Sequence, residues 1–200
     1  MGALPEGYTP PKSGGNYMKL GQGANKFRIL SKIIIGWETW IEENGKRKPI
    51  RSKRMNELPP SENKPKFFWA MVVWNYTDGQ LQILEVTQVS IRKALEELEG
   101  SEDWGDLRTY DITVKREGEG METVYSVIPS PTKPLDEAIK NEFVKTTINL
   151  DALYSGGNPF DSNELSDEET EEISNAISGG EKRREGSADE VTIDPEDLPF

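Results

Sequence analysis

The sequence predicts a mainly β protein with a helix inserted among its strands, a further helix towards the C-terminus and an acidic tail. Three observations support this fold class. Apolar and polar residues alternate between 27 and 37, which is the period of a half-buried strand. Asn44-Gly45 and the run "TDGQ" at 77–80 are turn sequences of β-hairpins. Apolar residues at 91, 94, 95 and 98 have helical spacing instead.

The ordered part of the chain is expected to begin near Ala24 with one long strand. Its basic residues should lie on the face opposite the core. The strand should end near Ile41 and fold back through Asn44-Gly45 into a basic ribbon at 46–52. Pro49 has no N–H to donate, so this return can only be an edge strand. The inward side chains are Phe27, Ile29, Ile33, Ile35 and Trp37, and the outward ones are Lys26, Arg28 and Lys32.

A second hairpin, from 66–76 through the turn to 81–87, should form the centre of the sheet. Its β-branched and aromatic residues favour strands on both sides of the turn. Alternation leaves two possibilities for the inward face of the first of these strands. They are either Phe67, Trp69 and Val73 or Phe68, Val72, Trp74 and Tyr76.

Two helices and two more strands complete the pattern. The first helix follows Thr87 and stops at Gly100. A strand in which Tyr110, Ile112 and Val114 alternate should be followed by a turn at "EGEG" and by a partner strand over 122–128. The last helix should start near Pro134, with Leu135, Ala138, Ile139 and Phe143 on one face.

This order of elements is that of an OB-fold, a five-stranded Greek-key barrel with its helix between the third and fourth strands. We expect three parts: a flexible arm over 1–23, the OB-fold domain over 24–150, and a disordered acidic tail over 151–200. Gly, Asn, Ser and acidic residues dominate from 155 onward, a composition that cannot bury enough apolar surface to order itself.

The formal net charge of −12 is concentrated in the tail. Residues 161–200 hold 14 acidic and 3 basic residues, net −11, whereas residues 1–160 hold 22 and 21, net −1. Within the body the basic residues cluster between Lys46 and Lys66. The chain therefore combines a nearly neutral domain, one basic loop and one acidic arm.

The composition argues against enzymatic activity. The chain has no Cys and no His, which excludes thiol nucleophiles, imidazole bases, disulfides and the usual zinc ligands. We therefore expect no cofactor and no metal, and a cytoplasmic location. No apolar run approaches the roughly 20 residues that span a bilayer, so we expect no membrane contact.

The basic loop and the neighbouring aromatic residues predict binding of single-stranded DNA. OB-folds bind oligonucleotides on the face of their second and third strands and through adjoining loops. Exposed rings stack on bases while cations neutralise phosphates, without dependence on sequence. The candidate residues are Trp37, Trp40, Lys46, Arg47, Lys48, Arg51, Lys53, Arg54, Lys66, Phe68, Trp74 and Tyr76.

The run "DPEDLPF" at 194–200 resembles the acidic tip of bacterial single-stranded DNA-binding proteins, which ends Asp-Asp-Ile-Pro-Phe. Residues 24–130, with "FWAMVVWNY" and "YDITVKREGEGMETVYSV", look like the monomeric OB-fold DNA-binding proteins of bacteriophages. The resemblance implies a role in phage DNA replication, recombination or repair in a bacterial cytoplasm. It also implies that enzymes of these processes bind the tip, at Asp194, Glu196, Asp197, Leu198, Pro199 and Phe200.

Two other functions stay open. The chain could be an acidic adaptor that uses a barrel only as a scaffold for its tail. It could also be a metal-dependent nuclease, for which Asp103 and Asp106 form the only close acidic pair of the body, although helix capping explains them as well.

Overall fold

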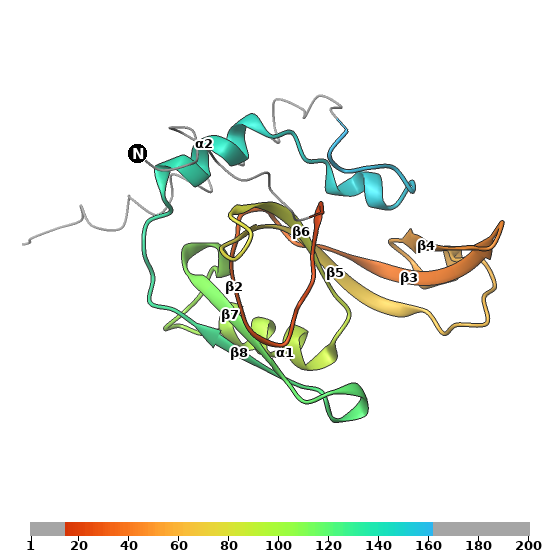
Figure 1. The fold of residues 1–200 in the computed structure, drawn as a ribbon, viewed down its shortest axis with the longest axis horizontal. Coiled ribbons are helices and arrows are strands. Elements are labelled where there is room, and N and C mark those ends of the chain that lie inside the picture. Colours follow the sequence, from red (N-terminus) through yellow and green to blue (C-terminus); the bar gives the residue numbers. More distant parts are fainter. Residues whose placement is uncertain (1–14, 162–200) are drawn as a thin grey trace, which may run out of the picture.

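Strands are the commonest regular element in the computed structural model of the chain, which describes residues 15–161 (Figure 1). The described residues form eight strands, two α-helices and four short 3-10 turns. The strands are β1 (Tyr17–Met18), β2 (Gly23–Ile29), β3 (Ile34–Glu43), β4 (Lys46–Ser52), β5 (Lys66–Asn75), β6 (Gln80–Val86), β7 (Asp111–Glu117) and β8 (Val124–Pro129). The helices are α1 (Val89–Glu99) and α2 (Glu137–Lys145), and the turns are η1 (Met55–Glu57), η2 (Leu107–Thr109), η3 (Gly120–Glu122) and η4 (Leu150–Leu153). The mainly β class is therefore confirmed.

The strands pair in one open sheet rather than in the five-stranded arrangement that we expected. The order is β1-β6-β5-β2-β7-β8, and β3 joins β5 on one side and β4 on the other. Strand β5 is the centre, because it pairs with β6 along most of its length, with β2 at its end and with β3 at its start. β1 and β8 are outer strands of this sheet, each with one partner among the described residues.

The predicted long first strand is divided into β2 and β3. Ile29 pairs with Val73 and Ile34 with Ala70, so four residues of the first strand lie opposite two residues of β5. The two extra residues form a bulge, in which the Ser31 hydroxyl accepts a hydrogen bond from the Val72 N–H at 2.9 Å. An even number of extra residues keeps the alternation in phase, so the sequence pattern could not show the break.

Both hairpins and both helices form where the sequence predicted them. Asn44 and Gly45 take positive φ angles of 53° and 72°, as a tight turn between β3 and β4 requires. Pro49 lies in β4, which pairs only with β3 among the residues that the structure describes and is therefore an edge strand. Helix α2 begins with a cap, since the Asp136 carboxylate accepts from the Ala138 N–H at 2.8 Å.

The two faces of β5 and β6 are both buried, against different partners. One face packs with β2, β7 and α1 in a first core cluster that includes Met71 and Val73. The other face packs under α2 and η4 in a second cluster that includes Phe68 and Val72 (Figure 1). Each fully buried side chain of this size contributes roughly 1.5–3 kcal/mol relative to exposure. Neither of the two expected inward sets is therefore the single core face.

The ordered body differs from the predicted domain boundaries at both ends. Met18, assigned to the flexible arm, is 6% exposed and lies in the first cluster. Leu153 and Phe160, assigned to the tail, pack in or against the second cluster. The Asn149 N–H donates to the Pro159 carbonyl at 2.8 Å and holds this segment in place.

Candidate nucleic-acid interface

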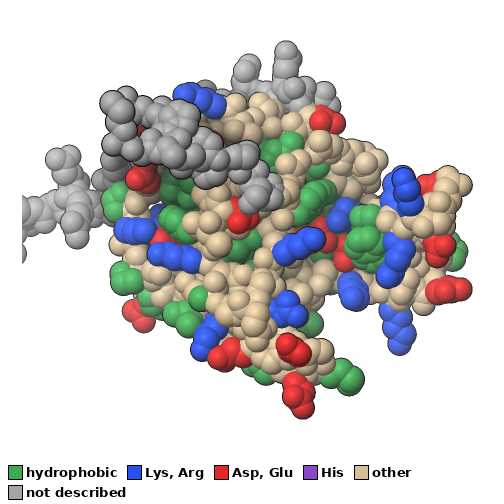
Figure 2. Space-filling view, viewed as in Figure 1, with side chains coloured by type: hydrophobic (Ala, Val, Ile, Leu, Met, Phe, Trp, Pro, Cys, Tyr) green, Lys and Arg blue, Asp and Glu red, His purple; other side chains and the backbone are tan. Residues whose placement is uncertain are grey.

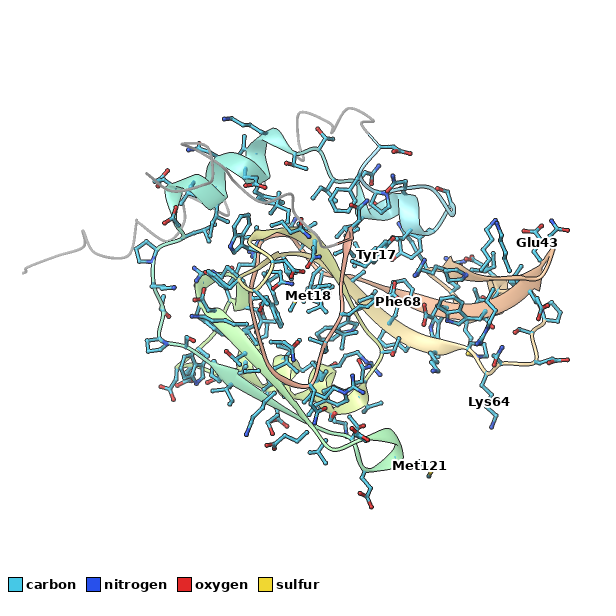
Figure 3. All side chains as sticks on the ribbon, viewed as in Figure 1. Tyr17, Met18, Glu43, Lys64, Phe68 and Met121 are labelled. Carbon is cyan, nitrogen blue, oxygen red and sulfur yellow. The ribbon has the colours of Figure 1, made fainter. Side chains whose placement is uncertain are left out.

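Strands β3 and β4 extend beyond the body of the protein, together with the connection from β4 to β5 (Figure 1). We call residues 36–66 the finger. Glu43 lies at its far end, and Lys64 lies on the connection beside it (Figure 3). The extension follows from the pairing, because β5 accompanies β3 only as far as Glu38, opposite Lys66, and β4 alone accompanies the remainder.

Basic side chains gather over the finger, with acidic ones among them (Figure 2). The exposed ion pairs at this end are long, since Lys48–Glu43 and Arg54–Glu57 each measure 3.9 Å. Pairs of this kind contribute at most about 1 kcal/mol and are screened by salt. These cations can therefore exchange their partners for a phosphate at little cost.

A groove of about 280 Å³ lies on one face of the finger. Strand alternation places Trp40 and Glu38 on this face of β3, Arg47 on β4 and Lys66 on β5. The Arg47 guanidinium carbon is 5.7 Å from the centre of the Trp40 ring. The groove is lined by Glu38, Trp40, Arg47, Asn63, Lys64 and Lys66.

The connection that carries Lys64 is attached to β3 by side-chain hydrogen bonds. The Trp40 carbonyl accepts from the Ser61 hydroxyl at 2.8 Å and from the Asn63 amide at 3.4 Å. The Thr39 hydroxyl donates to the Asn63 carbonyl at 3.3 Å. These bonds occupy the edge of β3 where β5 no longer pairs, and they hold the lysine beside the Trp40 ring.

Trp37 lies on the opposite face of β3 from Trp40, because the two are three positions apart, an odd offset along a strand. Its ring meets that of Phe67 edge to face, with 5.2 Å between the centres. The Arg92 guanidinium carbon of α1 is 4.9 Å from the Phe67 ring centre. Trp37 and Trp40, expected to bind together, thus belong to two different surfaces.

Arg51 is not available to a phosphate, contrary to the sequence prediction. Its side chain is 10% exposed, and its guanidinium lies 2.7 Å from Glu85 and 3.6 Å from Glu38. Its carbon also lies 5.8 Å from the Phe68 ring centre. Burial and a hydrogen bond with Glu38 raise the pKa of Glu85 to about 8, while Arg51 acts in the opposite direction. Arg51 thus forms ion pairs with Glu38 and Glu85 at the base of the finger.

The base of the finger is covered by η4 and the residue that follows it. The Tyr154 hydroxyl donates to the Ile35 carbonyl at 2.6 Å. Gly36 makes room for this contact, since a Cβ there would lie 3.0 Å from the Tyr154 ring and 2.6 Å from the Ser52 carbonyl oxygen. Lys53 lies over the same tyrosine, 5.1 Å from the ring centre, and 3.2 Å from Asp151.

The prediction that Phe68 stacks on DNA is wrong. Its side chain is 0% exposed, inside the second cluster where β5 leaves the finger (Figure 3). Trp74 and Tyr76 lie on the same face of β5, half-buried against this cluster. The cause is the cover formed by α2 and η4, which occupies the strand face that we expected to be open.

Of the other predicted residues, Lys46, Arg47, Lys48, Lys53, Arg54 and Lys66 are exposed on the finger. Asn63 and Lys64 belong to the groove but were missing from the predicted site. Lys64 lies in the same basic run of the sequence, and its position two residues before Lys66 was the signal for it. Asn63 carries no such signal.

Asp106 has the capping role that the sequence allowed. It accepts from the backbone N–H of Arg108 at 2.9 Å and forms an ion pair with the same residue at 2.8 Å. Burial works against its ionisation, but these bonds outweigh it and lower the pKa of Asp106. Among residues 15–161, no group of three or more Asp, Glu, His or Cys side chains is placed to hold a metal ion.

None of the helices in the described part of the chain is long and apolar enough to cross a membrane. The predicted partner-binding residues, Asp194, Glu196, Asp197, Leu198, Pro199 and Phe200, lie outside the described residues. Comparison of the chain with models of protein families, with curated proteins and with solved structures found no match.

Proposed function

We propose that the protein binds single-stranded DNA without sequence specificity and that the groove of the finger is the principal contact. One observation carries the proposal: the Trp40 ring lies beside three cationic side chains on an extended hairpin. A single strand offers each nucleotide's base to a ring and its phosphate to a cation. Glu38 does not oppose this, because it is 4% exposed and faces Arg51.

The pairing of the strands supports an OB-fold as the finer description. The first long strand, interrupted by its bulge, pairs with both β5 and β7. Helix α1 stands between the second hairpin and β7, as in that barrel. The protein would then differ from the usual OB-fold in that α2 and η4 cover the common binding face and the DNA path moves to the finger.

The biological setting that we propose is phage DNA replication, recombination or repair in a bacterial cytoplasm. It rests on the sequence resemblance, as does the proposal that residues 194–200 bind enzymes of these processes. The acidic segment 161–200 would also compete with DNA for the basic finger, since it carries net −11 on the same chain.

A titration with fluorescent oligo-dT tests the function. The wild type should bind and its tryptophan emission should be quenched. Trp40→Ala should weaken binding by about 1–3 kcal/mol, the usual contribution of one stacked ring. Trp37→Ala is the matched control, because its ring lies on the other face, and it should leave affinity nearly unchanged.

Three outcomes would contradict the proposal. Absence of binding by the wild type would favour an adaptor role for the acidic segment. Cleavage of the oligonucleotide in magnesium would favour a nuclease. Equal loss of affinity in both tryptophan variants, with unchanged melting temperatures, would place the contact outside the groove.

A further inference from the structure

Three cationic side chains surround one buried carboxylate at the end of β5 opposite the finger. Asp111 is 0% exposed, and its Oδ1 accepts from Arg28 at 3.0 Å and from the Tyr76 hydroxyl at 2.8 Å. Its Oδ2 lies 3.1 Å from the Lys26 ammonium and 2.8 Å from that of Lys133. We call these five residues the Asp111 cluster.

The fold brings the Asp111 cluster together from three parts of the chain. Arg28 pairs directly with Asp111 between β2 and β7, and Lys26 follows on the same face of β2. Lys133 comes from the segment between β8 and α2. Its backbone is held there, because its N–H donates to the Thr109 carbonyl at 3.3 Å and its carbonyl accepts from Arg28 at 2.8 Å.

The cluster has more positive than negative charge. Arg28 is buried, with a side chain 3% exposed, and it satisfies the carboxylate. The side chains of Lys26 and Lys133 are 44% and 49% exposed, and their charges remain. Asp136 is close enough to contribute to the raised pKa of Tyr76, after burial and Asp111, so one net positive charge is left when it is included.

The two lysines also keep hydrogen-bond donors for another group. Each ammonium group lies within hydrogen-bond distance of Asp111 Oδ2 and directs one donor towards it. An ammonium group carries three donors. Lys26 and Lys133 can therefore turn donors towards an anion outside the protein while they still neutralise Asp111.

Tyr76 is occupied in a way that disfavours the stacking role predicted from the sequence. Its ring centre lies 5.1 Å from the Lys26 ammonium and 5.6 Å from that of Lys133, so both cations border the ring. Its hydroxyl is engaged by Asp111. The tyrosine therefore positions the two lysines.

We propose that Lys26 and Lys133 bind a backbone phosphate of the single strand, with Arg28, Asp111 and Tyr76 as positioning residues. This inference rests on the proposed function and extends it. Tyr76 directly follows β5 and packs against the second cluster, ten residues beyond Lys66, which is at most about 33 Å of extended strand. The bound strand then contacts both ends of the β5 face whose middle is covered by α2 and η4.

The test is the salt dependence of oligo-dT binding by the full chain. Lys26→Gln/Lys133→Gln should reduce the slope of log K against log salt by about 0.7, one phosphate of a single strand. The ratio of wild-type to variant affinity for oligo-dT then falls about fivefold for each tenfold rise in salt concentration. Lys93→Gln/Lys145→Gln removes the same charge from exposed positions on α1 and α2 and should leave the slope unchanged.

Further variants separate positioning from stacking. Tyr76→Phe keeps the ring and removes the hydroxyl, so it should lower the slope in the same direction as the lysine variant. Unchanged binding by Tyr76→Phe together with a large loss in Tyr76→Ala would instead make the ring a stacking platform and overturn the inference. If the double variant does not fold, the salt dependence is measured on Lys133→Gln alone, and its melting temperature shows that this variant is folded.

The outcomes distinguish this inference from the proposed function. If the wild type does not bind oligo-dT, both fail. If it binds, and the slope falls in Lys64→Gln/Lys66→Gln but not in Lys26→Gln/Lys133→Gln, only the inference on the Asp111 cluster fails. The third outcome concerns free phosphate. If calorimetry shows that the wild type binds inorganic phosphate and Lys26→Gln/Lys133→Gln does not, while the salt dependence of oligo-dT binding is the same in both, the ligand is a free phosphate and the inference is overturned.

Discussion

Two arginines of β4, four residues apart and on the same face, contact aromatic rings at nearly equal distances. Arg47 lies 5.7 Å from the Trp40 ring centre and Arg51 lies 5.8 Å from that of Phe68. Arg47 is exposed, whereas the Arg51 side chain is 10% exposed and paired with two carboxylates. An arginine beside an aromatic ring thus forms a candidate binding surface towards the end of the finger and a structural contact at its base.

The difference comes from what covers each end of the finger. At the base, η4 and Tyr154 exclude water, so the guanidinium needs carboxylate partners and the carboxylates need the guanidinium. At the far end the Trp40 ring is half-buried beside the connection from β4 to β5, and Arg47 is exposed to water. Whether an arginine of β4 is buried in a structural contact or exposed to a ligand therefore depends on which distant segment covers it, and not on the local sequence.

The largest expected effect is on stability at the base. Arg51→Met should lower the free energy of unfolding by about 3–5 kcal/mol, because it leaves the buried Glu38 carboxylate without its cation. Arg47→Met is the matched control and should change it by less than about 0.5 kcal/mol, as exposed substitutions usually do. Urea denaturation at neutral pH measures both. Equal stability of the two variants would show that Arg51 contributes no more to stability at the base of the finger than Arg47 does at its far end.

The stability of the base should also depend on pH, through Glu85. Burial raises the folded-state pKa of Glu85 to about 8 from an ordinary value of 4.5. A raised folded-state pKa stabilises the protein below pH 4.5, and this contribution is lost as the pH rises towards 8. The chain has no His to add a titration in this window.

Glu85→Gln resembles the protonated carboxyl and should remove this pH dependence. The variant should therefore gain melting temperature relative to the wild type as the pH rises from about 5 to about 9. Thermal denaturation across that range measures the difference. If the melting temperatures of the two proteins instead changed in parallel over this pH range, Glu85 would be ionised across the whole range.

A smaller effect concerns DNA binding by the lysines of the groove. Lys64→Gln/Lys66→Gln should reduce the slope of log K against log salt by about 1.4, since each phosphate contact contributes about 0.7. Lys53→Gln/Arg54→Gln is the comparison at the base, where neither cation lines the groove, and should change the slope less. Equal reductions would extend the DNA contact along the whole finger.

The smallest effect is expected in the acidic segment. Loss of residues 161–200 should tighten oligo-dT binding, most at low salt where screening is weakest. Phe200→Ala leaves the charge unchanged, so DNA affinity should stay within about twofold, under 0.5 kcal/mol. The same substitution should prevent binding of the replication or repair enzyme that we propose as partner. A change in DNA affinity as large as that from loss of the segment would assign the ring to DNA binding instead.

The sequence by itself determined the elements whose signals are local. Asn44-Gly45 places the hairpin, because both residues tolerate positive φ. Apolar spacing locates α1 and α2, because a helix must turn one stripe towards the core. The run of cations between Lys46 and Lys66 is also visible in the sequence.

The tertiary structure alone decided which of these residues are available for binding. Arg47 and Arg51 have the same local pattern, and only the η4 segment, about 100 residues later in the chain, separates their roles. Phe68 became core for the same reason. Lys26 and Lys133 meet at Asp111 across more than 100 positions. Burial and charge pairing depend on contacts between such distant segments, and periodicity along the chain carries no record of them.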